Sequence, residues 1–290
     1  MTAAHFDPSD PMARPVVAAQ AQLAREDLAA GEIGRCVTEA FAYAEEASEE
    51  IARHVEPLRP ALACAAGCAA CCHGTTVLAS PPEVLHLAAH LGSTFGAEEL
   101  VALRAKVAEA ANHARTQTME ERAAARRPCP LLDVASGRCR AYEARPLACR
   151  AFHSYDKSAC ERELSAATLT MRIPSSATIF KVRHAVSLGV MAGAHSLGLD
   201  AMPVELTSAL DEALAGDLRG RWLEGERVFA ATVASRHFHE SYRQVLDPIA
   251  RALDDTRGEA APPVEAAAGG DAEAEARRAK NRKKRERRRR

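Results

Sequence analysis

The segment Cys64-Ala-Ala-Gly-Cys68-Ala-Ala-Cys71-Cys72 sets the fold of the middle of this chain. Thiols separated by two or three residues can converge on one metal ion or cluster. Four further cysteines follow within about ninety residues, and eight thiols suffice for two centres with four thiolate ligands each. We therefore expect a loop-rich core organised by metal, with eight ligands: Cys64, Cys68, Cys71, Cys72, Cys129, Cys139, Cys149 and Cys160.

Cys71 and Cys72 are adjacent, and the side chains of neighbouring residues diverge from Cα atoms about 3.8 Å apart. Two such cysteines rarely close on one tetrahedral ion. We expect them to serve different centres, or one of them to bridge two centres. The ninth cysteine, Cys36, lies on the apolar side of an expected helix and is interpreted as a small buried hydrophobic residue.

Arginines are concentrated around the second group of cysteines, against only Asp133 and Glu143 of opposite charge. Four thiolates around a divalent ion leave two negative charges, which guanidinium groups would offset while lowering the thiol pKa values. The alternative is a solvated face. We favour charge compensation, because the rest of the chain up to residue 276 is acidic. The residues are Arg126, Arg127, Arg138, Arg140, Arg145 and Arg150.

The first cysteine group, the segment Cys129-Pro-Leu-Leu and the spacing that follows resemble the YkgJ-type cysteine-cluster family, a zinc- or iron-chelating domain of the CxxxCxxCC type. The second motif reads Gly137-x-Cys139-x2-Tyr142-x2-Arg145-Pro146-x2-Cys149-Arg150. The resemblance spans about residues 64–160 and implies that these cysteines bind zinc, iron or an iron–sulfur cluster. A similar pattern occurs in flagellin lysine N-methylases, so an iron–sulfur-dependent transferase is an alternative.

Four residues between the later cysteines are expected to support the site. Pro146 would begin the helix that carries Cys149. Tyr142 would pack while its hydroxyl finds a partner. Arg145 and Arg150 would donate hydrogen bonds to sulfur or to loop carbonyls. No catalytic residue is identified, and no phosphate loop, dinucleotide fingerprint or nucleophile elbow occurs.

Cys64-x3-Cys68-x2-Cys71 also has the spacing of radical S-adenosylmethionine enzymes. Ala70 stands where those enzymes usually have an aromatic residue, and the chain lacks a barrel's alternation of strands and helices. His73 follows the first group, and His86 and His90 share a helical face. Over metal ligation, we favour a capping or solvated role for His73 and a solvated face for His86 and His90.

The fold class expected is mainly α, a helical body around the cysteine core, with abundant alanine favouring close packing of helices. Helical periodicity covers residues 15–30, 35–56, 98–127 and most of 175–253. Ser80 and Glu83 form a capping-box pattern at a helix start. A hairpin is expected to pair residues 131–132 with 141–142. The expected domains are N-terminal helices (1–59), a metal-binding domain (60–165), C-terminal helices (166–255) and a disordered linker and tail (256–290).

The tail 277–290 holds eleven Lys or Arg and one Glu, a net charge of +10, so residues 1–276 carry −11 of the total of −1. It could bind nucleic acid or an acidic surface without specificity, as an accessory function, or fold back on the acidic body. It has no aromatic residues for base stacking. Because no secretory signal or membrane-spanning segment is evident, we expect a cytoplasmic protein, where thiols stay reduced.

Overall fold

The computed structural model describes residues 10–11, 13–166 and 173–255. Contacts divide the chain into two compact units, Met1–Asp254 and Asp255–Arg290. The first unit contains all the cysteines, and every described residue except Asp255 belongs to it. The basic tail 277–290 and the disorder expected from residue 256 lie outside the described residues.

The expected fold class is confirmed: the described residues form eleven α-helices and little sheet. Two short antiparallel sheets pair β1 (Leu78–Ala79) with β4 (Val204–Glu205), and β2 (Leu132–Asp133) with β3 (Arg138–Cys139). None of the described helices has the length and apolar character that a membrane span requires. The helices are α1 (Ala13–Ala29), α2 (Ile33–Glu50), α3 (Pro81–Thr94), α4 (Ala97–Thr116), α5 (Met119–Ala125), α6 (Leu147–Ala151), α7 (Lys157–Ser165), α8 (Ala177–Ser196), α9 (Leu206–Ala215), α10 (Arg219–Leu223) and α11 (Val233–Asp255).

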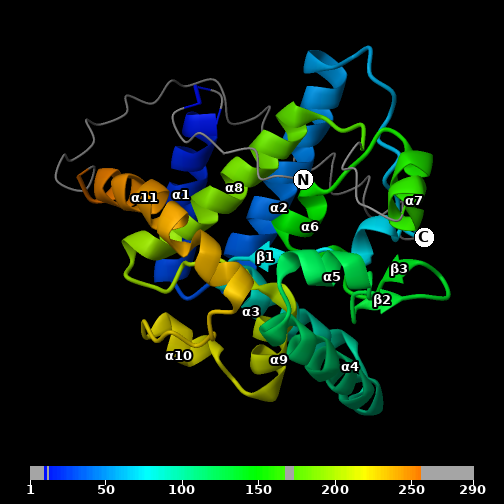
Figure 1. Cartoon of the computed structure of the whole chain (residues 1–290). Helices are drawn as coiled ribbons and strands as arrows, with labels where there is room; N and C mark the ends of the chain where they lie inside the picture. Colours follow the sequence, from blue (N-terminus) through cyan, green and yellow to red (C-terminus); the bar gives the residue numbers. More distant parts are fainter. Residues whose placement is uncertain (1–9, 12, 167–172, 256–290) are drawn as a thin grey trace, which may run out of the picture. The chain divides into compact units, whose positions relative to one another are not determined.

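The body is organised around α8, which packs along α1 and also contacts α2 and α6 (Figure 1). Two glycines of α8 permit this approach. A Cβ atom at Gly189 would lie 2.4 Å from the Cβ of Gln20, and one at Gly193 would lie 2.7 Å from the carbonyl oxygen of Ala21. The close helix packing expected from the alanine-rich composition is therefore present where α1 meets α8.

We expect Gly189→Ala to lower the free energy of unfolding by about 1–3 kcal/mol, because the new methyl group overpacks the α1–α8 contact. Gly92→Ala is the matched control. Gly92 lies in α3 with nothing within 4 Å of its added Cβ, so alanine there should stabilise by about 0.5 kcal/mol. Urea unfolding of both variants measures the difference. Equal effects would show that α1 and α8 do not pack this closely.

Two helix starts carry capping boxes, one expected and one missed. The box at Ser80 and Glu83 is confirmed, and it begins α3. The single helix expected over residues 98–127 is wrong, because Thr118 and Glu121 form a second capping box that begins α5 after a break. The backbone N–H of Glu121 donates to Thr118 Oγ1 over 3.2 Å, and that of Thr118 donates to Glu121 Oε2 over 2.7 Å.

The last third of the first unit follows the expected helical pattern, with breaks near Gly198, Pro203 and Gly216. Residues Leu78–Ala79, directly before the capping box at Ser80, form β1. Its partner β4 was not anticipated, since Val204–Glu205 is only two residues long and gives no alternating pattern. Cys36 is buried in α2 as expected, 3 % exposed, and burial raises the pKa of its thiol to about 12.

Candidate metal centre

The first cysteine group lies on a segment that contributes no buried residue to the hydrophobic core, although Leu62 and Val77 pack against its clusters. Residues 52–78 contain no buried residue, although they carry Cys64, Cys68, Cys71 and Cys72. Backbone hydrogen bonds attach the segment at a few points, such as the 2.8 Å bond from Ala63 N–H to the Ser154 carbonyl. Such a segment has little apolar burial to offset its conformational entropy, so another interaction is needed to keep it ordered.

The second group is attached to the core instead. Cys129, Cys139 and Cys149 are half-buried and pack against the main hydrophobic cluster. Cys149 lies in α6, which begins directly after Pro146 as expected. Cys139 lies in β3, and the hairpin forms with a register other than the expected one: Leu132 faces Cys139 rather than residues 141–142.

A short backbone ladder joins Cys72 to Cys129. Cys72 ends a 3-10 helix, η2 (Ala70–Cys72), and its carbonyl accepts a 2.7 Å hydrogen bond from Cys129 N–H. Gly74 N–H donates to the Arg127 carbonyl over 2.9 Å. Gly74 has φ +73°, and a Cβ there would lie 2.9 Å from the Arg122 carbonyl oxygen, so a glycine is required for the approach. The ladder places the two cysteines side by side.

A buried carboxylate fixes the helix that carries Cys149. Glu83 is 1 % exposed. Its Oε1 accepts a 2.6 Å hydrogen bond from Leu147 N–H at the start of α6, while its Oε2 accepts from Ser80 N–H and Oγ at 2.9 and 2.7 Å. Burial raises the pKa of this carboxyl group. The capping pattern indicated the contact to Ser80, but nothing local in the sequence indicated the contact to α6.

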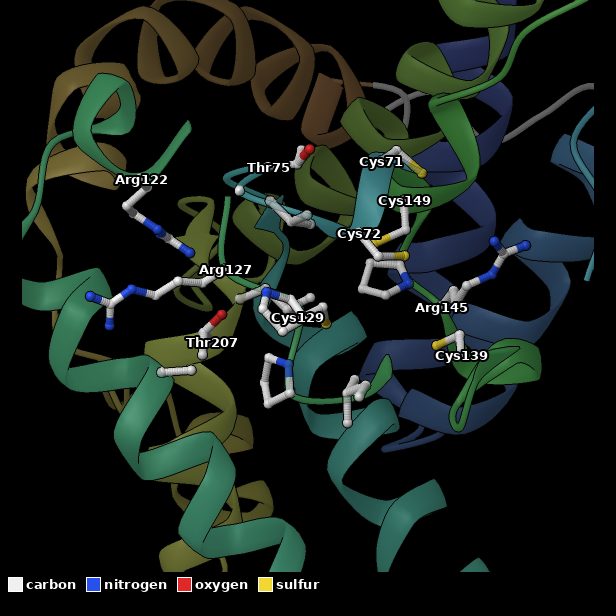
Figure 2. A pocket seen from close by; sticks show the side chains of 18 of the residues that line it. Cys71, Cys72, Thr75, Arg122, Arg127, Cys129, Cys139, Arg145, Cys149 and Thr207 are labelled. Carbon is white, nitrogen blue, oxygen red and sulfur yellow. The ribbon is translucent and has the colours of Figure 1, made fainter. Parts of the chain in front are cut away.

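Five of the eight cysteines line one cavity of about 100 Å³: Cys71, Cys72, Cys129, Cys139 and Cys149. Figure 2 shows these cysteines with Arg145 along one side of the pocket, and Arg122, Arg127 and Thr207 along the other. They come from η2, the loop after α5, β3 and α6. Segments nearly eighty residues apart in the sequence therefore meet here.

Of the remaining cysteines, Cys160 lines a second cavity. Cys71 also lines this cavity of about 260 Å³, together with His73, Phe152 and Glu163 among others. The helix α7, which carries Cys160, packs against η2.

Ser154 connects Cys64 to Cys160 beside this second cavity. Its N–H donates to Cys64 Sγ over 3.3 Å, and its side chain hydrogen bonds to Cys160. Cys68 and Cys71 are electrostatic neighbours of both Cys64 and Cys160. Cys64, Cys68 and Cys160 therefore form a second group, with Cys71 at the boundary between the two.

Four of the thiols that line the first cavity have raised pKa values. Burial raises the pKa of Cys129 to about 11 and that of Cys149 well above its ordinary value. Burial also raises the pKa of Cys139, whereas the hydrogen bond between the Cys71 and Cys72 side chains is the main cause of the raised pKa of Cys71. The arginines were expected to lower these values. Arg145 does act in that direction on Cys71, Cys139 and Cys149, but the other effects outweigh it.

The two arginines expected to support the site mainly contact aromatic rings and carbonyls. The guanidinium carbon of Arg145 lies 3.7 Å from the centre of the Tyr142 ring. Arg150 donates to the carbonyls of Arg145 and Glu143 over 2.8 and 2.7 Å, and pairs with Glu45 of α2 at 3.1 Å. Arg150 thereby connects the loop between Cys139 and Cys149 to the helical body.

The histidines near the site have other contacts. His73 Nδ1 lies 3.0 Å from the Ala69 carbonyl oxygen, which fits a local capping contact. His86 meets the Phe41 ring edge to face, and burial lowers its pKa. Within residues 10–11, 13–166 and 173–255, no three His, Cys, Asp or Glu side chains are already arranged to hold one metal ion. The cysteines are neighbours rather than a finished ligand shell.

These features define a mainly helical protein with a sulfur-rich centre at the junction of η2, β3 and α6. Residues 63–167 match the model of the CxxCxxCC family, whose description reads "Putative zinc- or iron-chelating domain". The match confirms the resemblance expected from the cysteine spacing and supports zinc or iron chelation by this part of the chain. No curated protein and no solved structure matched the chain.

Proposed function

We propose that this protein binds zinc or iron, the iron as single ions or as an iron–sulfur cluster, through its clustered cysteines, and that the metal holds the segment 52–78 to the helical body. The observation that carries the proposal is the absence of any buried residue in that segment. Metal–thiolate bonds supply the stabilisation that the core does not, and structural zinc sites contribute about 10–16 kcal/mol to folding in small domains.

The donor set fits such a metal. Soft thiolates select zinc and iron–sulfur clusters over magnesium or calcium. A tetrahedral zinc ion with Zn–S bonds of about 2.3 Å places its sulfur atoms about 3.8 Å apart. The cysteines that line the first cavity come from four segments, so they can approach one ion from different directions. Each thiol that binds releases its proton to solvent, since the thiolate is the ligand.

The arrangement favours a structural or electron-transfer role for the centre formed by Cys72, Cys129, Cys139 and Cys149. Four thiolates close a tetrahedral site and leave no position for a substrate. Arg145 also lines this cavity. Its positive charge offsets part of the negative charge of a four-thiolate site.

Metal analysis of cysteine variants tests the proposal. We expect Cys129→Ser and Cys149→Ser each to lose about half or more of the metal bound by the unmodified protein, because each removes a ligand from the core-attached side. Cys36→Ala is the control: it removes a cysteine of α2 that is buried in the main hydrophobic cluster and lines neither cavity. Unchanged metal content in both serine variants would contradict the proposal.

A further inference from the structure

The adjacent residues Cys71 and Cys72 lie between two cavities. Cys72 lines the first cavity together with Cys129, Cys139 and Cys149. Cys160 lines the second cavity, and Cys71 lines both. The 3-10 helix η2 thus forms a wall between the two groups, with the ladder to residues 127–129 on one side and α7 on the other.

The first cavity offers four candidate sulfur ligands besides Cys71. The backbone bond between Cys72 and Cys129 fixes two of them, the hairpin presents Cys139, and α6 presents Cys149. Figure 2 shows these four around one part of the pocket, with Cys71 at its edge. Because a tetrahedral site takes four ligands and these four cysteines supply them, Cys71 remains for the second cavity, which it also lines.

The second group needs Cys71 to reach four ligands. Cys64 and Cys160 both contact Ser154, and Cys68 lies two residues before Ala70, the first residue of η2. The loop between Cys64 and Cys68 is held against the β2–β3 hairpin, since a Cβ at Gly137 would lie 2.8 Å from the Gly67 carbonyl oxygen. The loop is therefore held against the hairpin, and it leads directly into η2, which carries Cys71.

We propose that the eight cysteines form two separate metal centres, one of Cys72, Cys129, Cys139 and Cys149 and one of Cys64, Cys68, Cys71 and Cys160. This inference rests on the proposed function and assigns its ligands. The vicinal pair is the point of division, and each member serves one centre. Both centres take a thiophilic ion, zinc or iron, or an iron–sulfur cluster.

The two centres differ in their access to solvent. Cys64 and Cys71 are exposed, whereas all four ligands of the first centre are half-buried, and three of them pack against the core. The second cavity also opens beside Cys71 and Cys160. A chelator should therefore remove metal from the second centre first. In the unmodified protein, we expect release in two phases of similar amplitude.

Paired substitutions test the assignment. Cys129→Ser and Cys160→Ser should each leave about half of the metal. The double variant Cys129→Ser/Cys149→Ser, within one set, should retain as much as either single variant, whereas Cys129→Ser/Cys160→Ser should retain almost none. Cys72→Ser removes a ligand of the first centre, so only the fast release of metal from the second centre should remain. Cys71→Ser removes a ligand of the second centre, so only the slow release from the first centre should remain. Far-UV circular dichroism confirms that each variant stays folded.

Each outcome bears on one claim. If unmodified protein, even after reconstitution without oxygen, binds no metal, the proposed function fails. If it binds metal but any single substitution removes all of it, or Cys71→Ser and Cys72→Ser lose the same phase, the division into two centres is overturned while metal binding stands. If a variant unfolds, the release kinetics of the unmodified protein decide: a single phase contradicts two centres of different exposure.

Discussion

Removing the metal should open residues 52–78 to proteolysis while the helical body stays protected. The segment has no buried residue, so its order depends on the metal–thiolate bonds proposed here. A hundredfold change in the population of an open form corresponds to about 2.8 kcal/mol, well below the about 10–16 kcal/mol typical of structural zinc. We expect chelation to raise the rate of cleavage in this segment by about a hundredfold or more.

Elastase is the suitable probe, because it cleaves after small residues, needs no metal and tolerates the chelator. Residues 60–70 contain six alanines and no Lys or Arg, so trypsin would not report on this stretch. The helix α8 provides an internal control, since Ala185, Ala192 and Ala194 are fully buried. Mass spectrometry of the fragments identifies the sites. Equal rates with and without chelator, or simultaneous cleavage of α8, would contradict a metal-held segment.

Glu83→Ala should cost about 3–5 kcal/mol of stability, because it removes a buried acceptor shared by three donors. Ser80 N–H, Ser80 Oγ and Leu147 N–H would lose their partner in a site where Glu83 is only 1 % exposed. The start of α6 would lose its anchor to α3, so we also expect weaker metal retention at Cys149. Denaturant unfolding and metal analysis measure the two effects.

Glu121→Ala is the matched control, because Glu121 occupies the same position in the capping box of α5 on an exposed surface. We expect a cost below about 1 kcal/mol and unchanged metal content. The stability cost of Glu83→Gln should lie between these two values. Its single amide oxygen can accept either from Ser80 or from Leu147 N–H, but not from both. If Glu83→Ala and Glu121→Ala cost the same, the bridge from α3 to α6 does not support the site.

Local patterns predicted local structure well in this chain. The capping box at Ser80, the helix start after Pro146 and the buried position of Cys36 each depend on a few neighbouring residues, and each is confirmed. The break before Met119 was missed because its capping box lies within a continuous helical pattern. The hairpin was expected, but its register was not. Its strands have only two residues each, which is too short for an alternating pattern to fix the pairing.

The candidate site could be predicted in composition but not in arrangement. Cysteine spacing indicated which thiols are candidate ligands. It did not show that Cys72 and Cys129 are joined through their backbones, or that α7 brings Cys160 to the opposite side of η2. These contacts depend on tertiary packing, and so does the effect of burial on the thiol pKa values, which exceeds that of the arginines. The cavities and the role of Glu83 toward α6 likewise arise only in the folded chain.

The most direct test of metal binding is metal analysis with an absorption spectrum on protein purified without oxygen. We expect bound zinc or iron in at least one equivalent per chain. Absorbance near 400 nm, about the region typical of iron–sulfur clusters, with iron and sulfide in similar amounts would identify a cluster, and a colourless protein with zinc would identify thiolate zinc sites. A folded protein that contains neither metal, and takes up neither on reconstitution, would contradict the account.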